Sequence, residues 1–110
     1  MFAVIYRGYV KPDREVEYQQ QWRVVANYFI SHRGALGSCL HQTEDRMWLA
    51  YSRWPDKKTR DASWPDSFEP FPIAIQEAIA AIKDCLDENN PLPEICMEVV
   101  DDLILRDFKP

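Results

Sequence analysis

Two side chains that could move a proton or carry charge, His41 and Arg7, interrupt otherwise apolar, strand-like stretches of this sequence. An imidazole titrates near neutral pH, so His41 could accept the proton of a phenol. His41 also has a structural alternative, as a partly buried residue held by a hydrogen bond. Arg7 could hold an anionic group, or it could pair with an acid on the last strand, because buried charges usually have partners.

Large aromatic side chains follow these two candidates along the chain. Trp48, Tyr51 and Trp54 lie close together, and Trp64 and Phe68 come after them in a proline-rich segment. Aromatic walls could hold a planar ligand, but aromatic residues more often pack in a core. The sequence leaves both interpretations open.

The stretch that carries most of these residues is predicted to form a β-hairpin. Residues 36–43 and 46–54 are rich in strand-forming types. The polar pair Glu44-Asp45 between them can close a tight turn. This hairpin would therefore position the candidate residues.

A two-residue turn fixes which side chains of the hairpin share a face. It pairs Thr43 with Arg46, and alternation then places His41 opposite Trp48, on the face that also holds Trp54. Both faces carry large apolar groups, so the hairpin needs a covering on each side. One predicted face holds Cys39, His41, Trp48, Ala50, Ser52 and Trp54, and the other holds Leu36, Ser38, Leu40, Met47, Leu49, Tyr51 and Arg53.

The segments around the hairpin predict a strand and two helices. Residues 2–10 alternate as a strand does, and residues 13–33 repeat apolar positions at helical spacing. One predicted face of this strand holds Phe2, Val4, Tyr6, Gly8 and Val10, and the other holds Ala3, Ile5, Arg7 and Tyr9. Asp13 is the predicted N-cap of that helix, and Gly34 is placed to end it. A short polar helix is predicted to start at Asp56 after the hairpin.

The last third of the chain completes the fold. Residues 73–87 predict a helix, and residues 94–107 predict a long strand or two short strands joined at a kink. The order β-α-β-β-α-β is that of a ferredoxin-like α+β domain, here one domain over residues 1–110. Its four-stranded antiparallel sheet carries helices on one face only. The bare face predicts a homodimer, with the last strand crossing to the partner.

Adjacent acids, Asp101 and Asp102, interrupt the apolar last strand. A bulge, or an interface pairing with Arg53 or Arg106, is the favoured explanation. Catalysis by these acids would need a second perturbed group nearby.

Composition and charge restrict the function. The chain has 110 residues, of which 46% are hydrophobic, and its net charge is −5. A packed globular domain is expected, and an acidic chain without a basic face is not expected to bind nucleic acid or an anionic membrane. Its apolar runs are too short or too interrupted to span a bilayer, and its start does not have the pattern of a signal peptide. A cytoplasmic protein is therefore predicted.

Cysteine and histidine spacing predicts no metal site. Cys39, Cys85 and Cys96 are an odd number without a C-x-x-C pair, so free buried thiols are expected. His32 and His41 share no metal-ligand spacing with each other or with a cysteine.

With this order of elements, residues 34–64 resemble the antibiotic biosynthesis monooxygenase family. The resemblance rests on the helix-ending Gly34, the polar turn Glu44-Asp45, and a second hairpin strand that ends in YSRW before a polar helix start. It implies a dimeric α+β barrel. The family includes cofactor-independent monooxygenases of aromatic polyketides, haem-degrading enzymes, and members without a known reaction.

The resemblance also implies roles for single positions. Trp54 matches a tryptophan that borders a substrate pocket between sheet and helices, and Tyr51 matches a tyrosine on the same strand. Ala50 stands where the polyketide oxidisers can place an asparagine. Trp64 lies near the position of a tryptophan in the haem degraders, but their asparagine on strand one and their histidine on the second helix are missing here. Haem binding or degradation is therefore disfavoured.

The function predicted from these observations is a small cofactor-independent monooxygenase acting on an aromatic or quinone-like metabolite. Such an enzyme needs an apolar cavity, aromatic walls and one group that favours the ionised substrate, and no cofactor is expected. The alternative is a non-catalytic homodimer of the same fold that binds a small ligand or another protein. The predicted catalytic residues are His41 and Arg7, and the predicted substrate-binding residues are Trp48, Tyr51, Trp54, Trp64 and Phe68.

Overall fold

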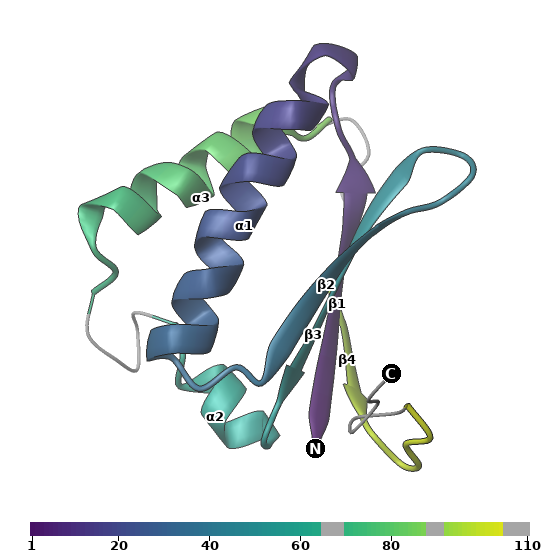
Figure 1. The fold of residues 1–110 in the computed structure, drawn as a ribbon, viewed down its shortest axis with the longest axis vertical. Coiled ribbons are helices and arrows are strands. Elements are labelled where there is room, and N and C mark those ends of the chain that lie inside the picture. Colours follow the sequence, from purple (N-terminus) through teal and green to yellow (C-terminus); the bar gives the residue numbers. More distant parts are fainter. Residues whose placement is uncertain (65–69, 88–91, 105–110) are drawn as a thin grey trace, which may run out of the picture.

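The computed structural model of the chain describes residues 1–64, 70–87 and 92–104. They form one antiparallel sheet with the strand order β2-β3-β1-β4, together with helices in the predicted ferredoxin-like sequence (Figure 1). The predicted fold class is confirmed. The elements are β1 (Phe2–Tyr9), the 3-10 turn η1 (Pro12–Arg14), α1 (Glu15–His32), β2 (Gly37–Gln42), β3 (Met47–Trp54), α2 (Lys57–Asp61), α3 (Ile73–Cys85) and β4 (Ile95–Glu98).

The two long helices, α1 and α3, lie on the same side of the sheet, as predicted (Figure 1). In the described part of the chain, no helix lies on the other side. The strand pairings give the sheet two faces, which we call the helix-facing side and the open face. The helix-facing side holds Phe2, Val4, Tyr6, Gly8, Ser38, Leu40, Gln42, Trp48, Ala50, Ser52, Trp54 and Cys96, and the open face holds Ala3, Ile5, Arg7, Tyr9, Cys39, His41, Met47, Leu49, Tyr51, Arg53, Ile95 and Met97.

A compact core joins α1 to the helix-facing side. Phe2 and Val4 of β1 pack with Ala35 and Trp54, and Phe29 of α1 lies against this cluster. The alternation predicted for the first strand is confirmed, because its buried even-numbered residues face the helices.

The hairpin register differs from the prediction by one residue. The loop between β2 and β3 has three residues, flanked by Thr43 and Met47, whose backbone groups form a hydrogen bond of 2.9 Å. The third loop residue, Arg46, adopts a positive φ of 69°, which is typical of three-residue hairpin loops. The pairing of His41 with Trp48 was therefore wrong, and His41 lies opposite Leu49.

The N-cap prediction for the first long helix was also wrong. Asp13 lies inside the 3-10 turn that Pro12 starts, and α1 begins after it, at Glu15. Arg14 holds the N-cap position without a side-chain capping bond. At the other end, the prediction that Gly34 ends the helix is confirmed, because this glycine has a φ of 87°.

Replacing Gly34 with alanine should lower the free energy of unfolding by about 1–2 kcal/mol, because an L-residue is strained at positive φ. A Cβ atom at this position would also lie 2.9 Å from Cγ2 of Thr59. Gly37 is the control, since a Cβ atom there meets no heavy atom within 4 Å. Urea denaturation of both alanine variants checks this, and equal stabilities would contradict it.

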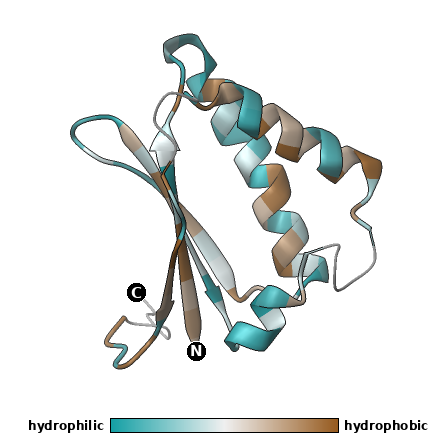
Figure 2. Ribbon diagram, turned by 180° about the vertical axis from the view of Figure 1, so that it is seen from behind, coloured by the Kyte–Doolittle hydropathy of each residue, from teal (hydrophilic) through white to brown (hydrophobic). Residues whose placement is uncertain are grey.

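The last strand is shorter than predicted. β4 pairs with β1 over four residues, after which the chain leaves the ladder, with Val99 donating its backbone N–H to the Met1 carbonyl at 2.9 Å. Val100 and Leu103 are almost fully exposed. This segment is largely apolar in Figure 2. The end of the predicted strand, residues 105–107, lies outside the described residues.

Tyr18 of α1 gives the chain a sensitivity to alkali. Its ring is buried against Trp48, with ring centres 5.4 Å apart, and burial raises its pKa to about 12. Above about pH 10 the unfolded chain ionises this phenol and the folded chain does not, so stability should fall between roughly pH 10 and 12. Unfolding measured across that range should show a smaller loss for Tyr18→Phe than for the unchanged protein. Equal losses would contradict this assignment.

Candidate functional site

His41, a predicted catalytic residue, lies exposed on the open face. Its Nδ1 is 3.2 Å from the backbone carbonyl oxygen of Leu49 on the neighbouring strand. Because Trp54 faces the helices, His41 cannot act on a ligand held beside that tryptophan. The cross-strand hydrogen bond fits the structural alternative, but His41 is exposed and not partly buried as that alternative expected.

Arg7 also lies on the open face, where its Nε is buried without a hydrogen-bond partner among the described residues. The predicted pairing with an acid of the last strand is not formed by these residues. The reason is the short β4 ladder, which runs from Ile95 beside Ile5 toward Met1, so the acids that follow it lie far from Arg7.

Trp54 belongs to the core, and Trp48 is half-buried against α1. Trp54 is only 4% exposed and packs in the cluster with Phe2 and Val4, while its indole N–H donates to Ser52 Oγ at 3.2 Å. Trp48 packs edge-on against Tyr18. These contacts fit the packing alternative for both tryptophans.

Trp64 is a better candidate for a ligand contact, because 36% of its surface is exposed. Its ring lies 5.5 Å from that of Phe29 and 5.6 Å from that of Phe71. The guanidinium of Arg33 stacks over Phe71 at 4.7 Å and so closes this aromatic cluster. Phe68, the last predicted ligand residue, lies outside the described residues.

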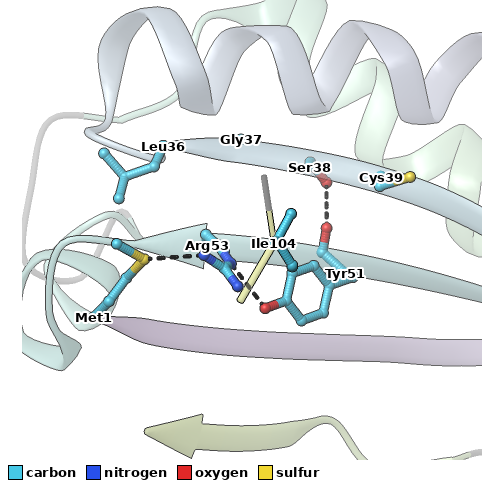
Figure 3. A pocket seen from close by; sticks show the side chains of 8 residues that line it. All are labelled: Met1, Leu36, Gly37, Ser38, Cys39, Tyr51, Arg53 and Ile104. Atoms are coloured by element: carbon cyan, nitrogen blue, oxygen red, sulfur yellow. Dashed lines mark hydrogen bonds between the residues drawn. The ribbon is translucent and has the colours of Figure 1, made fainter. Parts of the chain in front are cut away.

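A pocket of about 430 Å³ lies on the open face, on the side opposite the hairpin tryptophans. Figure 3 shows the side chains that line it. Tyr51, a predicted ligand residue, forms part of its wall. Its lining is mostly apolar or backbone, and it consists of Met1, Leu36, Gly37, Ser38, Cys39, Tyr51, Arg53 and Ile104.

The arginine of this pocket is already neutralised. Arg53 donates from Nη1 to Asp102 at 2.5 Å and from Nε to the Tyr51 hydroxyl at 2.9 Å. The Asp102 carboxylate, followed by Tyr51, raises the pKa of Arg53. Of the two late acids, Asp102 thus pairs with Arg53, but within one chain and not across the predicted interface. The pocket suits an apolar group better than an anion.

The cysteines differ from the expectation of buried thiols. Cys85 is buried at the end of α3, but Cys39 and Cys96 are exposed. Cys39 lies on the open face, and Cys96 lies on β4, which is an edge strand and therefore has less cover.

A polar cluster on the helix-facing side brings together Tyr6, Arg60 and Glu94. Arg60 reaches from α2 and donates from Nη2 to the Tyr6 hydroxyl at 3.0 Å and to the Glu94 carboxylate at 2.5 Å. Its Nη1 lies 3.4 Å from Asp61. The cluster thus ties α2 to both β1 and the start of β4.

Burial sets the protonation of this cluster. It raises the pKa of Tyr6, and the hydrogen bond and charge of Arg60 oppose that rise only in part, so the phenol stays protonated at neutral pH. Burial works against the charge of Arg60, but its contacts with Tyr6 and Glu94 raise its pKa overall. A neutral phenol beside a fixed cation can bind an oxygen anion.

The sequence predicted the face of Tyr6, but not its contact with Arg60 or the contact of Arg60 with Glu94. Alternation along the first strand placed Tyr6 on the same face as Val4, which is correct. Arg60 was predicted only to lie in a polar helix, because its contact with Glu94 depends on where the chain returns as β4.

In the described residues, no group of three or more His, Cys, Asp or Glu could hold a metal ion, and no helix has the length and apolar character of a membrane span.

No known family model matches the chain, and no curated protein matches it in sequence. Solved structures match its fold. A Nitrosomonas europaea protein assigned to the antibiotic biosynthesis monooxygenases has a TM-score of 0.71 at 16% identity, covering 92% of this chain and 100% of that one. A variant of SnoaB, a cofactor-independent oxygenase from Streptomyces nogalater, gives 0.71 at 12% identity over 93% and 95%. Rv0793 from Mycobacterium tuberculosis gives 0.70 at 14% identity over 94% and 98%. The chain therefore has the fold of the antibiotic biosynthesis monooxygenases it resembles.

Proposed function

We propose that this protein is a small cofactor-independent oxygenase, and that its substrate is an aromatic or quinone-like metabolite held between the sheet and the helices. Two of the structures that it resembles are of proteins described as monooxygenases or oxygenases. A shared fold alone leaves the reaction open, so the proposal depends on the site.

The observation that carries the proposal is the position of Tyr6. Tyr6 is 36% exposed on the helix-facing side, where Val4 and Gly8 of β1 are buried, and its hydroxyl is hydrogen-bonded to Arg60. The site thus combines an accessible aromatic ring with a fixed positive charge. A phenol could pack on the ring and direct its oxygen toward the charge. Trp64 remains a proposed ligand contact on the same side of the sheet.

The proposed reaction needs little chemistry from the protein. An ionised phenol can transfer electrons to O2. Its oxidation to a quinone is balanced, because one phenol and one O2 give one quinone and one water. The substrate supplies all four electrons. The residues of the site would bind the substrate, exclude water and favour the ionised form.

Oxygen uptake tests the proposal. The purified protein, treated with a chelator and given no flavin or haem, should consume O2 with α-naphthol and form one naphthoquinone per O2. The rate should rise in proportion to the protein concentration. No uptake above the buffer rate, for α-naphthol and for a series of dihydroxynaphthalenes, would contradict an oxygenase and favour the non-catalytic alternative.

We also propose that the protein is a homodimer joined through the open face. This face carries Ile5, Leu49 and Met47 without a covering helix among the described elements. The apolar segment after β4 borders the open face, and Ile104 of this segment lines the pocket on that face. An apolar sheet face of this kind is usually covered by a partner, and a second copy would bring an equal face to it.

A further inference from the structure

The hydroxyl of Tyr6 has a hydrogen to donate. It accepts a hydrogen bond from Arg60, and none of the described residues accepts a hydrogen bond from it. A hydroxyl that accepts from a cation becomes a stronger donor, because the two hydrogen bonds polarise each other. Tyr6 is thus prepared to donate to a strong acceptor on the helix-facing side.

Arg60 provides a charge that is fixed in place. Its side chain is only 11% exposed, and Asp56 caps its helix by accepting from the Thr59 backbone N–H at 2.7 Å. The Arg60 Nε is buried and has no partner among the described residues. A cation held in a partly dry site acts more strongly on a nearby charge than one in water does.

From this geometry we infer that Tyr6 and Arg60 form a subsite for the ionised oxygen of a planar phenol or enol. The inference rests on the proposed function for the position of the ligand ring. Tyr6 donates its O–H to the oxygen anion, and Arg60 stabilises the negative charge through Tyr6 and by its own field. The substrate class is therefore an acidic phenol or enol that binds as its anion.

Glu94 determines the strength of this subsite. Its carboxylate takes part of the Arg60 charge at 2.5 Å, and it would repel a bound anion. Asp61 also lies near Arg60, but Lys57 pairs with it at 2.6 Å. Removing the Glu94 charge should therefore strengthen anion binding, whereas removing either Tyr6 or Arg60 should weaken it.

The open face supplies a matched control. Arg53 donates to the Tyr51 hydroxyl just as Arg60 donates to Tyr6, so the chain contains two Arg–Tyr pairs on opposite faces. In the open-face pair, Asp102 neutralises the arginine inside an apolar pocket. Tyr51→Phe thus removes the same chemical group as Tyr6→Phe, but from the opposite face.

The test is the apparent pKa of bound α-naphthol, measured by naphtholate absorbance under argon so that no turnover occurs. The unchanged protein should lower this pKa by about one unit or more, which is at least tenfold tighter binding of the anion than of the neutral phenol. Tyr6→Phe and Arg60→Gln should abolish the shift, Glu94→Gln should increase it, and Tyr51→Phe should leave it unchanged. Circular dichroism verifies that each variant is folded.

Three outcomes would overturn the inference: no binding of α-naphthol, a shift that survives Tyr6→Phe, or a shift that is lost in Tyr51→Phe. Glu94→Gln keeps both donors, so its effect can be read even if another variant is unstable. The assay also separates this inference from the proposed function. A Tyr6-dependent shift without oxygen uptake would retain the subsite and reject the oxygenase. Oxygen uptake without such a shift would retain the oxygenase and reject the subsite.

Discussion

Replacing Trp54 with alanine should lower the free energy of unfolding by about 3–5 kcal/mol, the usual cost of removing a large buried aromatic side chain. The indole is almost fully buried and packs with Phe2, Val4 and Ala35. Its removal would leave a cavity between β1, β3 and α1 that the rigid sheet cannot close. Chemical denaturation followed by circular dichroism measures the change.

Trp64→Ala is the control for this substitution, since it removes the same side chain from a position that is 36% exposed. Its cost should be no more than about 2 kcal/mol, because much of that ring is already in contact with water. If Trp54→Ala instead left stability unchanged and abolished ligand binding, Trp54 would be a pocket wall, as the family resemblance implied, and its assignment to the core would be wrong.

Replacing Leu49 with aspartate should weaken the proposed dimer about a hundredfold or more. Leu49 lies in the middle of the open face, between Arg7 on one neighbouring strand and His41 on the other. In a dimer joined through this face, the new carboxylate would be buried against apolar groups of the partner, which typically costs several kcal/mol. Sedimentation equilibrium of both proteins over a range of concentrations measures the effect.

Val24→Asp adds the same charge to an exposed position of α1, on the helix side of the molecule. It should leave association unchanged. A protein that sediments as a monomer without any substitution would contradict the proposed dimer, and so would a dimer that tolerates Leu49→Asp.

The fold was predictable because its signals are local. Alternation along the first strand grouped Phe2 and Val4 on one face, and helical spacing predicted the helices α1 and α3. Gly34 marked the end of α1, since glycine is the residue that adopts a positive φ without strain. Each of these features depends on residues only a few positions apart.

The hairpin register was not predictable from the same kind of signal. It depends on whether the loop has two residues or three, and here Arg46, which is not a residue that favours this conformation, adopts the positive φ of the longer loop. A shift of one residue moves every side chain of one strand to the other face. For this reason His41 was expected beside Trp54 and lies instead on the open face.

The candidate site was harder to predict because its contacts are distant in sequence. Arg60 meets Tyr6 across 54 positions and Glu94 across 34 positions. Arg60 occurs in a polar helix that has the composition of a solvated one, so its sequence gave no indication of a buried guanidinium. Only the return of the chain as β4 brings Glu94 to the same place.

A crystal structure of the protein with bound α-naphthol tests the central claim most directly. We predict electron density for the naphthol ring between the sheet and the helices, with its oxygen about 2.5–3.0 Å from the hydroxyl of Tyr6. A naphthol ring seated instead in the open-face pocket beside Tyr51 and Arg53 would contradict the claim that the helix-facing side is the functional one.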